Sequence, residues 1–173
     1  MYSSEFSEVT YLEDLNVVFV KWKKFCSNDD YRKPLLYALD ILVNNKNCNY
    51  VADTRDGFEN EPADTKWLLD VFLQQTKKTT CKAIFFIIDN DNKLKEHLEE
   101  QSFELKKLFD VYYCFGLDEV KSIISEKSKY WQNYRDWVIF NMDKNLYLLA
   151  ELDNEAQLLK KLLKRIELKE NIW

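Results

Sequence analysis

The segment CKAIFFII, residues 81–88, decides the fold class of this chain, because it is the most hydrophobic stretch in the sequence. Its apolar residues follow one another without alternating with polar ones, a pattern that is typical of a strand with both faces covered. The uninterrupted apolar run Ala83–Ile88 is far shorter than the ~20 residues that a membrane-spanning helix needs. We therefore expect a buried strand of an α/β sheet, and no membrane span.

On both sides of this segment, the hydrophobic patterns of strands alternate with those of helices. Apolar residues three and four apart indicate helices, and short apolar runs bounded by turn residues indicate strands. In the helix expected to begin at Pro62, the buried stripe would be Trp67, Leu68, Val71 and Phe72. The other expected elements are two strands within residues 7–22, strands at 48–53 and 111–115, and helices over about 29–43, over about 94–109 and from 117.

This alternation predicts a mostly parallel sheet, because two parallel neighbouring strands need a crossover between them, which is usually a helix. The two strands within residues 7–22 would form a hairpin and add an antiparallel edge. Residues 1–125 are thus expected to form one α/β domain, with helices packed on the sheet.

Residues 126–173 have a different pattern and are expected to form an extension of that domain. Two apolar stretches, Trp137–Met142 and Leu146–Leu152, flank Asp143-Lys144-Asn145 and predict a hairpin, although the loop lacks the usual glycine. From Asp153 onward, apolar residues at helical spacing predict an amphipathic helix. A small hairpin and a short helix are not stable alone, so the extension should pack on the main domain or on another chain.

The composition excludes several classes of function. The chain has two glycines, too few for the glycine-rich loops that bind nucleotide phosphates, and one histidine, which excludes histidine-rich zinc sites. Its net charge of −5 argues against general nucleic-acid binding. The four cysteines form no CxxC pair, and we expect them to be reduced and structural. The amino-terminal segment is acidic, unlike a signal peptide, so we expect a cytoplasmic protein.

The order of these elements resembles the STAS fold of anti-sigma-factor antagonists, in particular the SpoIIAA-like and STAS/SEC14-type families. In that pattern the central strand ends in an Asp-containing turn, here Asp53-Thr54-Arg55, and the last strand leads into a short helix. The resemblance covers about residues 5–125 and implies a protein that works by contacts with other proteins. The stretches that carry it are NVVFVKW (16–22), YRKPLLYALDIL (31–42), NYVADTRDGF (49–58), AIFFIID (83–89) and VYYCFGLDEVKSII (111–124).

Phosphoregulated members of this family carry an Asp-Ser-Ser-Gly-like step at the start of the next helix. Here the corresponding stretch is Ala63-Asp64-Thr65-Lys66, which has neither serine nor glycine. Thr65 is the hydroxyl residue that can take the place of the serine, and a phosphate near a helix N-terminus is electrostatically favourable. Thr65 is therefore the candidate phosphoacceptor, and the alternative is an ordinary exposed helix residue.

We expect a ligand or a partner at the carboxyl ends of the strands, where open α/β sheets bind their ligands. Arg55 at this edge can bind an anion or pair with a neighbouring carboxylate. The loop after the central strand supplies the candidate residues Asp53, Thr54, Arg55, Asp56 and Phe58.

A second interpretation of this edge is a metal site. Asp53, Asp89 and Asp91 would supply carboxylate oxygens, the ligands that Mg²⁺ prefers, and would support hydrolysis. The same residue types serve as helix caps and turn residues, which is the interpretation that we favour. We therefore expect no bound metal.

The extension contains more aromatic residues than a small hairpin can bury. These residues either cover one face of the sheet or form the surface of a homodimer or of a complex with another protein, since aromatic side chains are enriched at interface centres. They are Trp131, Tyr134, Trp137, Phe140 and Tyr147.

Together these features predict a non-enzymatic, cytoplasmic STAS-like domain with a regulatory or protein-interaction role. Its partner would be another protein or a second copy of the chain, and we expect no cofactor and no nucleic acid. Two alternatives stay open: a domain that binds a small lipid or nucleotide between its helices, which the resemblance permits, and a metal-dependent hydrolase.

Overall fold

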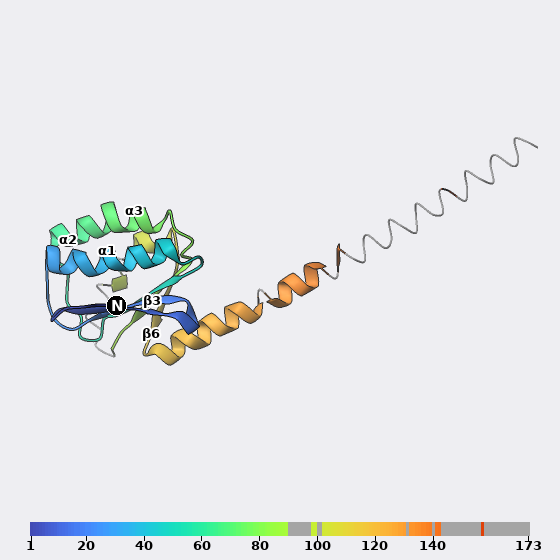
Figure 1. Cartoon of the computed structure of the whole chain (residues 1–173), viewed down its shortest axis with the longest axis horizontal. Helices are drawn as coiled ribbons and strands as arrows, with labels where there is room; N and C mark the ends of the chain where they lie inside the picture. Colours follow the sequence, from blue (N-terminus) through green and yellow to red (C-terminus); the bar gives the residue numbers. More distant parts are fainter. Residues whose placement is uncertain (90–97, 100–101, 131, 140, 143–156, 158–173) are drawn as a thin grey trace, which may run out of the picture. The chain divides into compact units, whose positions relative to one another are not determined.

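The structure is a computed structural model that describes residues 1–89, 98–99, 102–130, 132–139, 141–142 and 157. By its internal contacts the chain divides into two compact units, Met1–Ile124 and Ser125–Trp173. The first unit contains a six-stranded sheet with helices packed on it (Figure 1). None of the helices in the described residues is both long enough and hydrophobic enough to cross a membrane.

The strands follow one another across the sheet in the order of the chain. The first three strands pair antiparallel with one another, and the third strand and the three that follow it pair parallel. The predicted mixed, mostly parallel sheet with an antiparallel hairpin is thus confirmed. The two-residue edge strand β1 is an addition that the sequence did not predict. The strands are β1 (Tyr2–Ser3), β2 (Ser7–Leu12), β3 (Val17–Trp22), β4 (Asn49–Asp53), β5 (Ala83–Ile87) and β6 (Asp110–Cys114).

Figure 1 shows α1, α2 and α3 together on one face of the sheet. The parallel strands follow one another across the sheet in one direction, and connections between parallel strands are right-handed. The helices in these connections therefore lie on the same side of the sheet. Residues 102–106 and 117–130 are also helical. The bounds are α1 (Asp29–Asn44), between β3 and β4, and a continuous helical run between β4 and β5 made of α2 (Pro62–Trp67), the π-helix η2 (Leu68–Phe72) and α3 (Leu73–Thr76).

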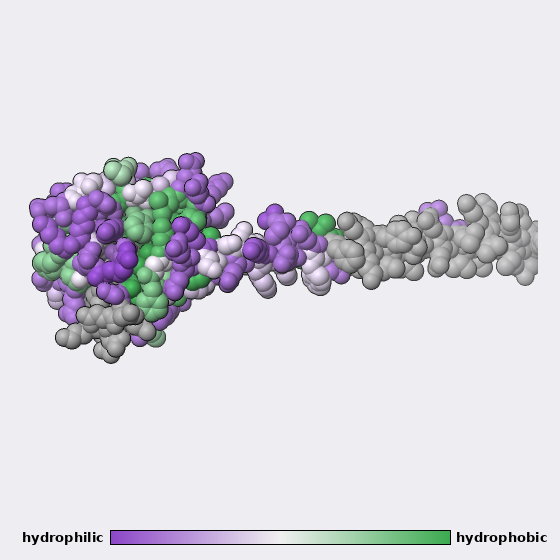
Figure 2. Space-filling model, turned by 90° about the horizontal axis from the view of Figure 1, so that it is seen from below, coloured by the Kyte–Doolittle hydropathy of each residue, from purple (hydrophilic) through white to green (hydrophobic). Residues whose placement is uncertain are grey.

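Two hydrophobic cores cover the two faces of the sheet. The first lies under the helices and includes Leu35 of α1 and Phe72 of η2. The second lies on the opposite face, where Val51 and Phe85 belong to one cluster with Val120 of the helix that begins at residue 117. Figure 2 views the molecule from the side away from α1 and α3 and shows a hydrophobic area between hydrophilic margins. The prediction that residues 81–88 form a strand covered on both faces is thus confirmed.

The π-helical segment η2 changes which residues of its helical run are buried. The predicted stripe placed Val71 inside, but Val71 is 38% exposed, whereas Leu73 is buried and Leu69 packs against the first core. A π-helix bonds residues five apart rather than four, so the positions after it are rotated relative to a continuous α-helix. The prediction was right for Trp67, Leu68 and Phe72 and wrong for Val71.

The extension is helical where it is described, so the predicted strand Trp137–Met142 is wrong. Residues 132–139 and 141–142 are helical. Gln132 Nε2 donates to Asp136 Oδ1 at 3.0 Å, and Asn141 Nδ2 donates to the carbonyl oxygen of Trp137 at 2.8 Å. Partners four residues apart meet on a helix and not on a strand, so these bonds agree with the helix, although aromatic residues favour strands. The second strand of the predicted hairpin lies outside the described residues.

Candidate functional site

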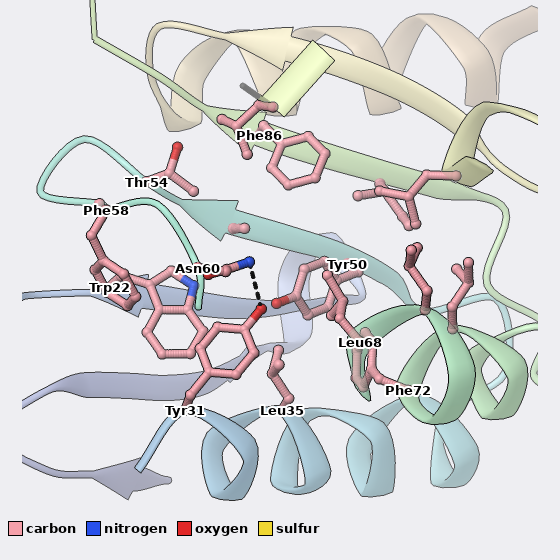
Figure 3. A pocket seen from close by; sticks show the side chains of 17 residues that line it. Trp22, Tyr31, Leu35, Tyr50, Thr54, Phe58, Asn60, Leu68, Phe72 and Phe86 are labelled. Carbon is pink, nitrogen blue, oxygen red and sulfur yellow. Dashed lines mark hydrogen bonds between the residues drawn. The ribbon is translucent and has the colours of Figure 1, made fainter. Parts of the chain in front are cut away.

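A cavity lies between the helices and the sheet, near the carboxyl ends of three parallel strands. It offers about 80 Å³ to the centres of water-sized molecules, within about 830 Å³ of unfilled space that includes open solvent, and 17 of the described residues line it (Figure 3). Trp22 of β3, Ala52 of β4 and Phe86 of β5 come from neighbouring strands. Open α/β sheets bind their ligands at this edge. The cavity is therefore the candidate site.

Aromatic rings form much of the cavity wall. Trp22 stacks on Tyr31 of α1 with ring centroids 5.1 Å apart, and Phe58 meets Trp22 edge to face at 5.9 Å. On the other side, Tyr50 and Phe72 meet edge to face at 5.8 Å. Such packing fixes the rings in place, because each offset or edge-on pair has a preferred geometry. The walls of the cavity are thus built largely of aromatic rings packed against one another.

The polar groups that the described residues contribute to the wall are uncharged. They are the hydroxyl groups of Tyr31, Tyr50 and Thr54 and the side-chain amide of Asn60, among otherwise aliphatic and aromatic residues. Burial raises the pKa of Tyr31 and Tyr50 well above the usual value of a phenol, so both rings carry their proton at neutral pH. Such groups can bind a neutral molecule by hydrogen bonds.

The loop predicted from the sequence as a ligand or partner site divides into two parts. Thr54 and Phe58 line the cavity, together with Gly57. Asp53, Arg55 and Asp56 are not part of its lining. The Thr54 hydroxyl donates to the carbonyl oxygen of Ile87 at 2.9 Å, which fastens the start of the loop to β5. The loop therefore borders the cavity, and its charged residues face elsewhere.

Asp53 and Arg55 form an ion pair outside the cavity. Arg55 Nε donates to Asp53 Oδ1 at 2.9 Å, and its terminal nitrogen donates to Oδ2 at 2.7 Å. Burial by itself would raise the pKa of Asp53, but the hydrogen bonds and the charge of Arg55 outweigh burial and hold that pKa below its usual value. Of the two predicted roles of Arg55, the structure shows the pairing with a carboxylate.

We expect Arg55→Met to lower the free energy of unfolding by about 1–2 kcal/mol at pH 7, less than for a fully buried pair because Arg55 is half exposed. A carboxyl group whose pKa is lowered by folding stabilises the protein above its unfolded pKa, about 3.9 for Asp, and loses this effect as the pH falls through its folded pKa. The difference between the variant and the wild type should therefore shrink below about pH 4.

Urea denaturation at a series of pH values measures this difference. Lys66→Met, which breaks the exposed pair with Asp70, is the matched control and should change stability little at any pH. A stability difference for Arg55→Met that stays constant from pH 7 to about pH 2 would contradict the ion pair as its source.

A second ion pair joins the helices beside the cavity. Asp64 of α2 is 1% exposed, and its Oδ1 accepts from Arg32 Nε of α1 at 2.8 Å. Its Oδ2 accepts from the backbone N–H of Asn28 at 2.7 Å. Thr65, the candidate phosphoacceptor, follows on α2 and is half-buried. Its backbone N–H donates to the carbonyl oxygen of Glu61 at 2.9 Å.

The predicted metal site is only partly within the described residues. Asp53 is bound by Arg55, and Asp89 lies near enough to contribute to the raised pKa of Arg55. Asp91 lies outside the described residues. Among the residues that the structure describes, no three histidine, cysteine, aspartate or glutamate side chains are grouped in a way that could hold a metal ion.

All four cysteines are buried and none is in a disulfide. Burial raises the pKa of the Cys26, Cys48 and Cys114 thiols to about 11 and that of Cys81 to about 12. A thiol reacts as its thiolate, so these groups are weak nucleophiles at neutral pH. This environment agrees with the structural role predicted for them.

The predicted interface residues of the extension are described in part. Tyr134 and Trp137 lie on one helical stretch with ring centroids 6.3 Å apart, and they are 49% and 61% exposed. Trp131, Phe140 and Tyr147 lie outside the described residues. Whether these aromatic residues meet the sheet or a partner thus stays a prediction.

Sequence reasoning missed most residues of the cavity wall, including Trp22, Tyr31, Tyr50 and Phe72. Some signals were available, because Tyr50 and Ala52 alternate along β4 and therefore share one face of the sheet. Their place in the first core could be inferred from that alternation. The unfilled space could not, because it depends on how closely α1 and η2 approach the sheet.

The α/β class of the first unit is established by the geometry of its sheet, and the STAS-type identity remains a prediction. The cavity, likewise, is defined by its own walls rather than by analogy with another protein. Comparisons of the chain with protein-family models, with curated proteins and with solved structures give no match.

Proposed function

We propose that this chain is a non-enzymatic binding domain that takes up a small, uncharged and largely apolar molecule in the cavity beside β3, β4 and β5. The observation that carries this proposal is the cavity itself, with its aromatic walls and uncharged polar groups. Of the functions predicted from the sequence, it supports the small-ligand alternative best.

A ligand that binds in the cavity would bury apolar surface away from water, and the wall does not require the ligand to be charged. Each Å² of apolar surface that a ligand buries contributes roughly 25 cal/mol, before the cost of immobilising the ligand is subtracted. The walls are held by ring pairs and by the Asp64–Arg32 ion pair, so little ordering of the protein is needed on binding. A largely preformed apolar site of this kind favours binding.

A filling variant tests the proposal with N-phenylnaphthylamine, an uncharged dye that fluoresces strongly in apolar surroundings. The wild-type protein is expected to bind the dye, and Leu68→Trp, which places an indole against the cavity, should abolish the fluorescence increase. Val71→Trp is the matched control, because Val71 lies on the same π-helix, is 38% exposed and does not line the cavity.

The fluorescence titration is read together with circular dichroism, so that loss of the fold is not mistaken for loss of the site. Equal dye binding by the wild type and Leu68→Trp, with both folded, would show that the dye binds elsewhere. No binding by the wild type would reject the proposal directly.

The regulatory and protein-interaction role implied by the STAS resemblance is a second proposal. The exposure of Trp137 in the extension supports it, since a large aromatic side chain that is 61% exposed is the kind of residue that interfaces bury. Under this proposal the cytoplasmic domain would contact another protein or a second copy of itself.

A further inference from the structure

Two phenol groups lie inside the cavity, and each retains a proton with no acceptor among the described residues. Tyr31 is 5% exposed and Tyr50 is 6% exposed, so both side chains are more than nine-tenths buried. They come from different elements, α1 and β4, and Figure 3 shows both hydroxyl groups among the residues that line the cavity. Their hydrogen bonds decide what the cavity can recognise.

The Tyr31 hydroxyl acts as an acceptor in the structure. Asn60 Nδ2 donates to its oxygen at 3.0 Å, and its own proton meets no acceptor among the described residues. The Tyr50 hydroxyl makes no hydrogen bond to a described residue. In the described residues, every fully buried side-chain oxygen or nitrogen has a hydrogen-bond partner. The Tyr50 oxygen has none, so it is not fully buried. It is therefore reachable from the cavity.

The other polar groups of the wall are already engaged. The Thr54 hydroxyl donates to the carbonyl oxygen of Ile87, and the Asn60 amide donates to Tyr31. If the hydroxyl groups of Tyr31 and Tyr50 bond to each other, one donates and the other accepts. At least one O–H group is therefore still available as a donor in the cavity. A ligand that shields this donor from water must supply an acceptor, because a buried donor without one is costly.

We propose that the ligand carries a neutral carbonyl oxygen on an apolar body, and that the hydroxyl groups of Tyr50 and Tyr31 donate hydrogen bonds to this oxygen. This inference rests on the proposed function, since it specifies the chemistry of the same cavity. Ketones, quinones, esters and amides share this acceptor.

The surroundings favour a neutral acceptor over a carboxylate. Burial raises the pKa of Tyr31, which shows that a negative charge at this hydroxyl is unfavourable, and the nearby charge of Asp64 raises it further although Arg32 pairs with that carboxylate. The described residues that line the cavity provide no cation to balance an anionic ligand. An uncharged oxygen can accept from the phenols without the cost of burying an unbalanced charge.

Two matched compounds test the proposal by displacing N-phenylnaphthylamine from the cavity. Acetylnaphthalene has a carbonyl oxygen, and isopropenylnaphthalene has nearly the same shape with a CH₂ group in its place. The measured quantity is the ratio of their two dissociation constants in each protein. Comparing this ratio between proteins cancels the hydration of the free compounds, which is the same in every titration.

Tyr50→Phe is the main variant, because it removes a hydroxyl with no described partner and should leave the fold intact. In this variant the preference for the ketone should fall about three- to tenfold relative to the wild type, the size of one neutral hydrogen bond. Tyr31→Phe should also lower it. Tyr37→Phe is the control: Tyr37 lies on the same helix as Tyr31, does not line the cavity and should keep the wild-type ratio.

The outcomes separate the two proposals. An unchanged ratio in Tyr50→Phe, with both compounds displacing the dye, would overturn the carbonyl inference and leave the binding function standing. A wild-type protein that binds no dye would overturn the binding function and the inference with it. A ratio that falls in Tyr50→Phe and stays constant in Tyr37→Phe supports both.

Discussion

Replacing Asp64 with alanine is expected to lower the free energy of unfolding by about 2–4 kcal/mol. The Asp64 carboxylate is buried and joins two helices, because it accepts from the Arg32 guanidinium of α1 and from the backbone N–H of Asn28, just before α1 begins. Alanine would leave both donors without an acceptor. Arg32 is partly exposed and can still reach water, which keeps the cost below that of a fully buried pair.

Urea denaturation measures this effect, and Asp70→Ala is the matched control. Asp70 lies on the same helical run and pairs with Lys66, but both side chains are well exposed, so its loss should cost less than about 0.5 kcal/mol. Asp64→Ala should also weaken dye binding, because the pair positions α2 against α1 beside the cavity. If the two substitutions lowered the free energy of unfolding equally, burial of the Asp64 pair would add nothing to stability.

Phe85→Ala is expected to lower the free energy of unfolding by about 3–5 kcal/mol, the range for a large aromatic residue removed from a core. Phe85 is 1% exposed and stacks on Tyr112 with ring centroids 5.0 Å apart. It belongs to the second core, on the face opposite the cavity. The substitution therefore leaves an empty volume that the strands on either side of β5 cannot fill.

The neighbouring residue on β5 provides a control with the opposite orientation. Phe86 lines the cavity and is half-buried, so Phe86→Ala removes a ring that already borders unfilled space and should cost about 1–2 kcal/mol. Phe86→Ala should alter dye affinity, whereas Phe85→Ala should leave it nearly unchanged in the folded protein. A smaller loss for Phe85→Ala than for Phe86→Ala would contradict the second core.

Much of the sheet could be predicted from the sequence because its signals are local. β5 lies within the apolar run of residues 81–88, and the spacing of Leu35, Leu39 and Leu42 matches α1. Alternation of such segments along the chain was enough to predict a mostly parallel sheet. These features depend on periodicity within one element, which is visible without knowing what lies across from it.

The π-helix and the helical extension were mispredicted for physical reasons. Leu69 rather than Val71 packs against the first core because of one change in hydrogen-bond spacing, and the hydrophobic pattern of η2 fits either register nearly as well. In the extension, aromatic residues favoured a strand, while contacts four residues apart, such as that of Gln132 with Asp136, stabilise a helix. In both places two structures compete closely.

The cavity lies at the edge of the sheet where the sequence predicted a ligand or a partner, but its wall differs from the predicted residues. The loop from Asp53 to Phe58 does border the cavity, as the position of strand ends implies. The sequence emphasised charged residues there, and the structure pairs Asp53 with Arg55 instead of aiming them into the cavity. A side chain's partner is a property of three-dimensional packing, so the emphasis on charge was misplaced.

Because each strand pairs with the one that precedes it in the chain, the sheet can be built outward from its amino-terminal hairpin without leaving a gap for a later strand. Contacts close in sequence form with a small loss of chain entropy and favour rapid folding. On a ribosome, β1 to β4 and α1 could assemble while later segments are still being made. The cavity would be completed only after the segment beyond β5 has been made, because Leu98 and Leu105 also line it, so ligand uptake would mark synthesis of most of the first unit.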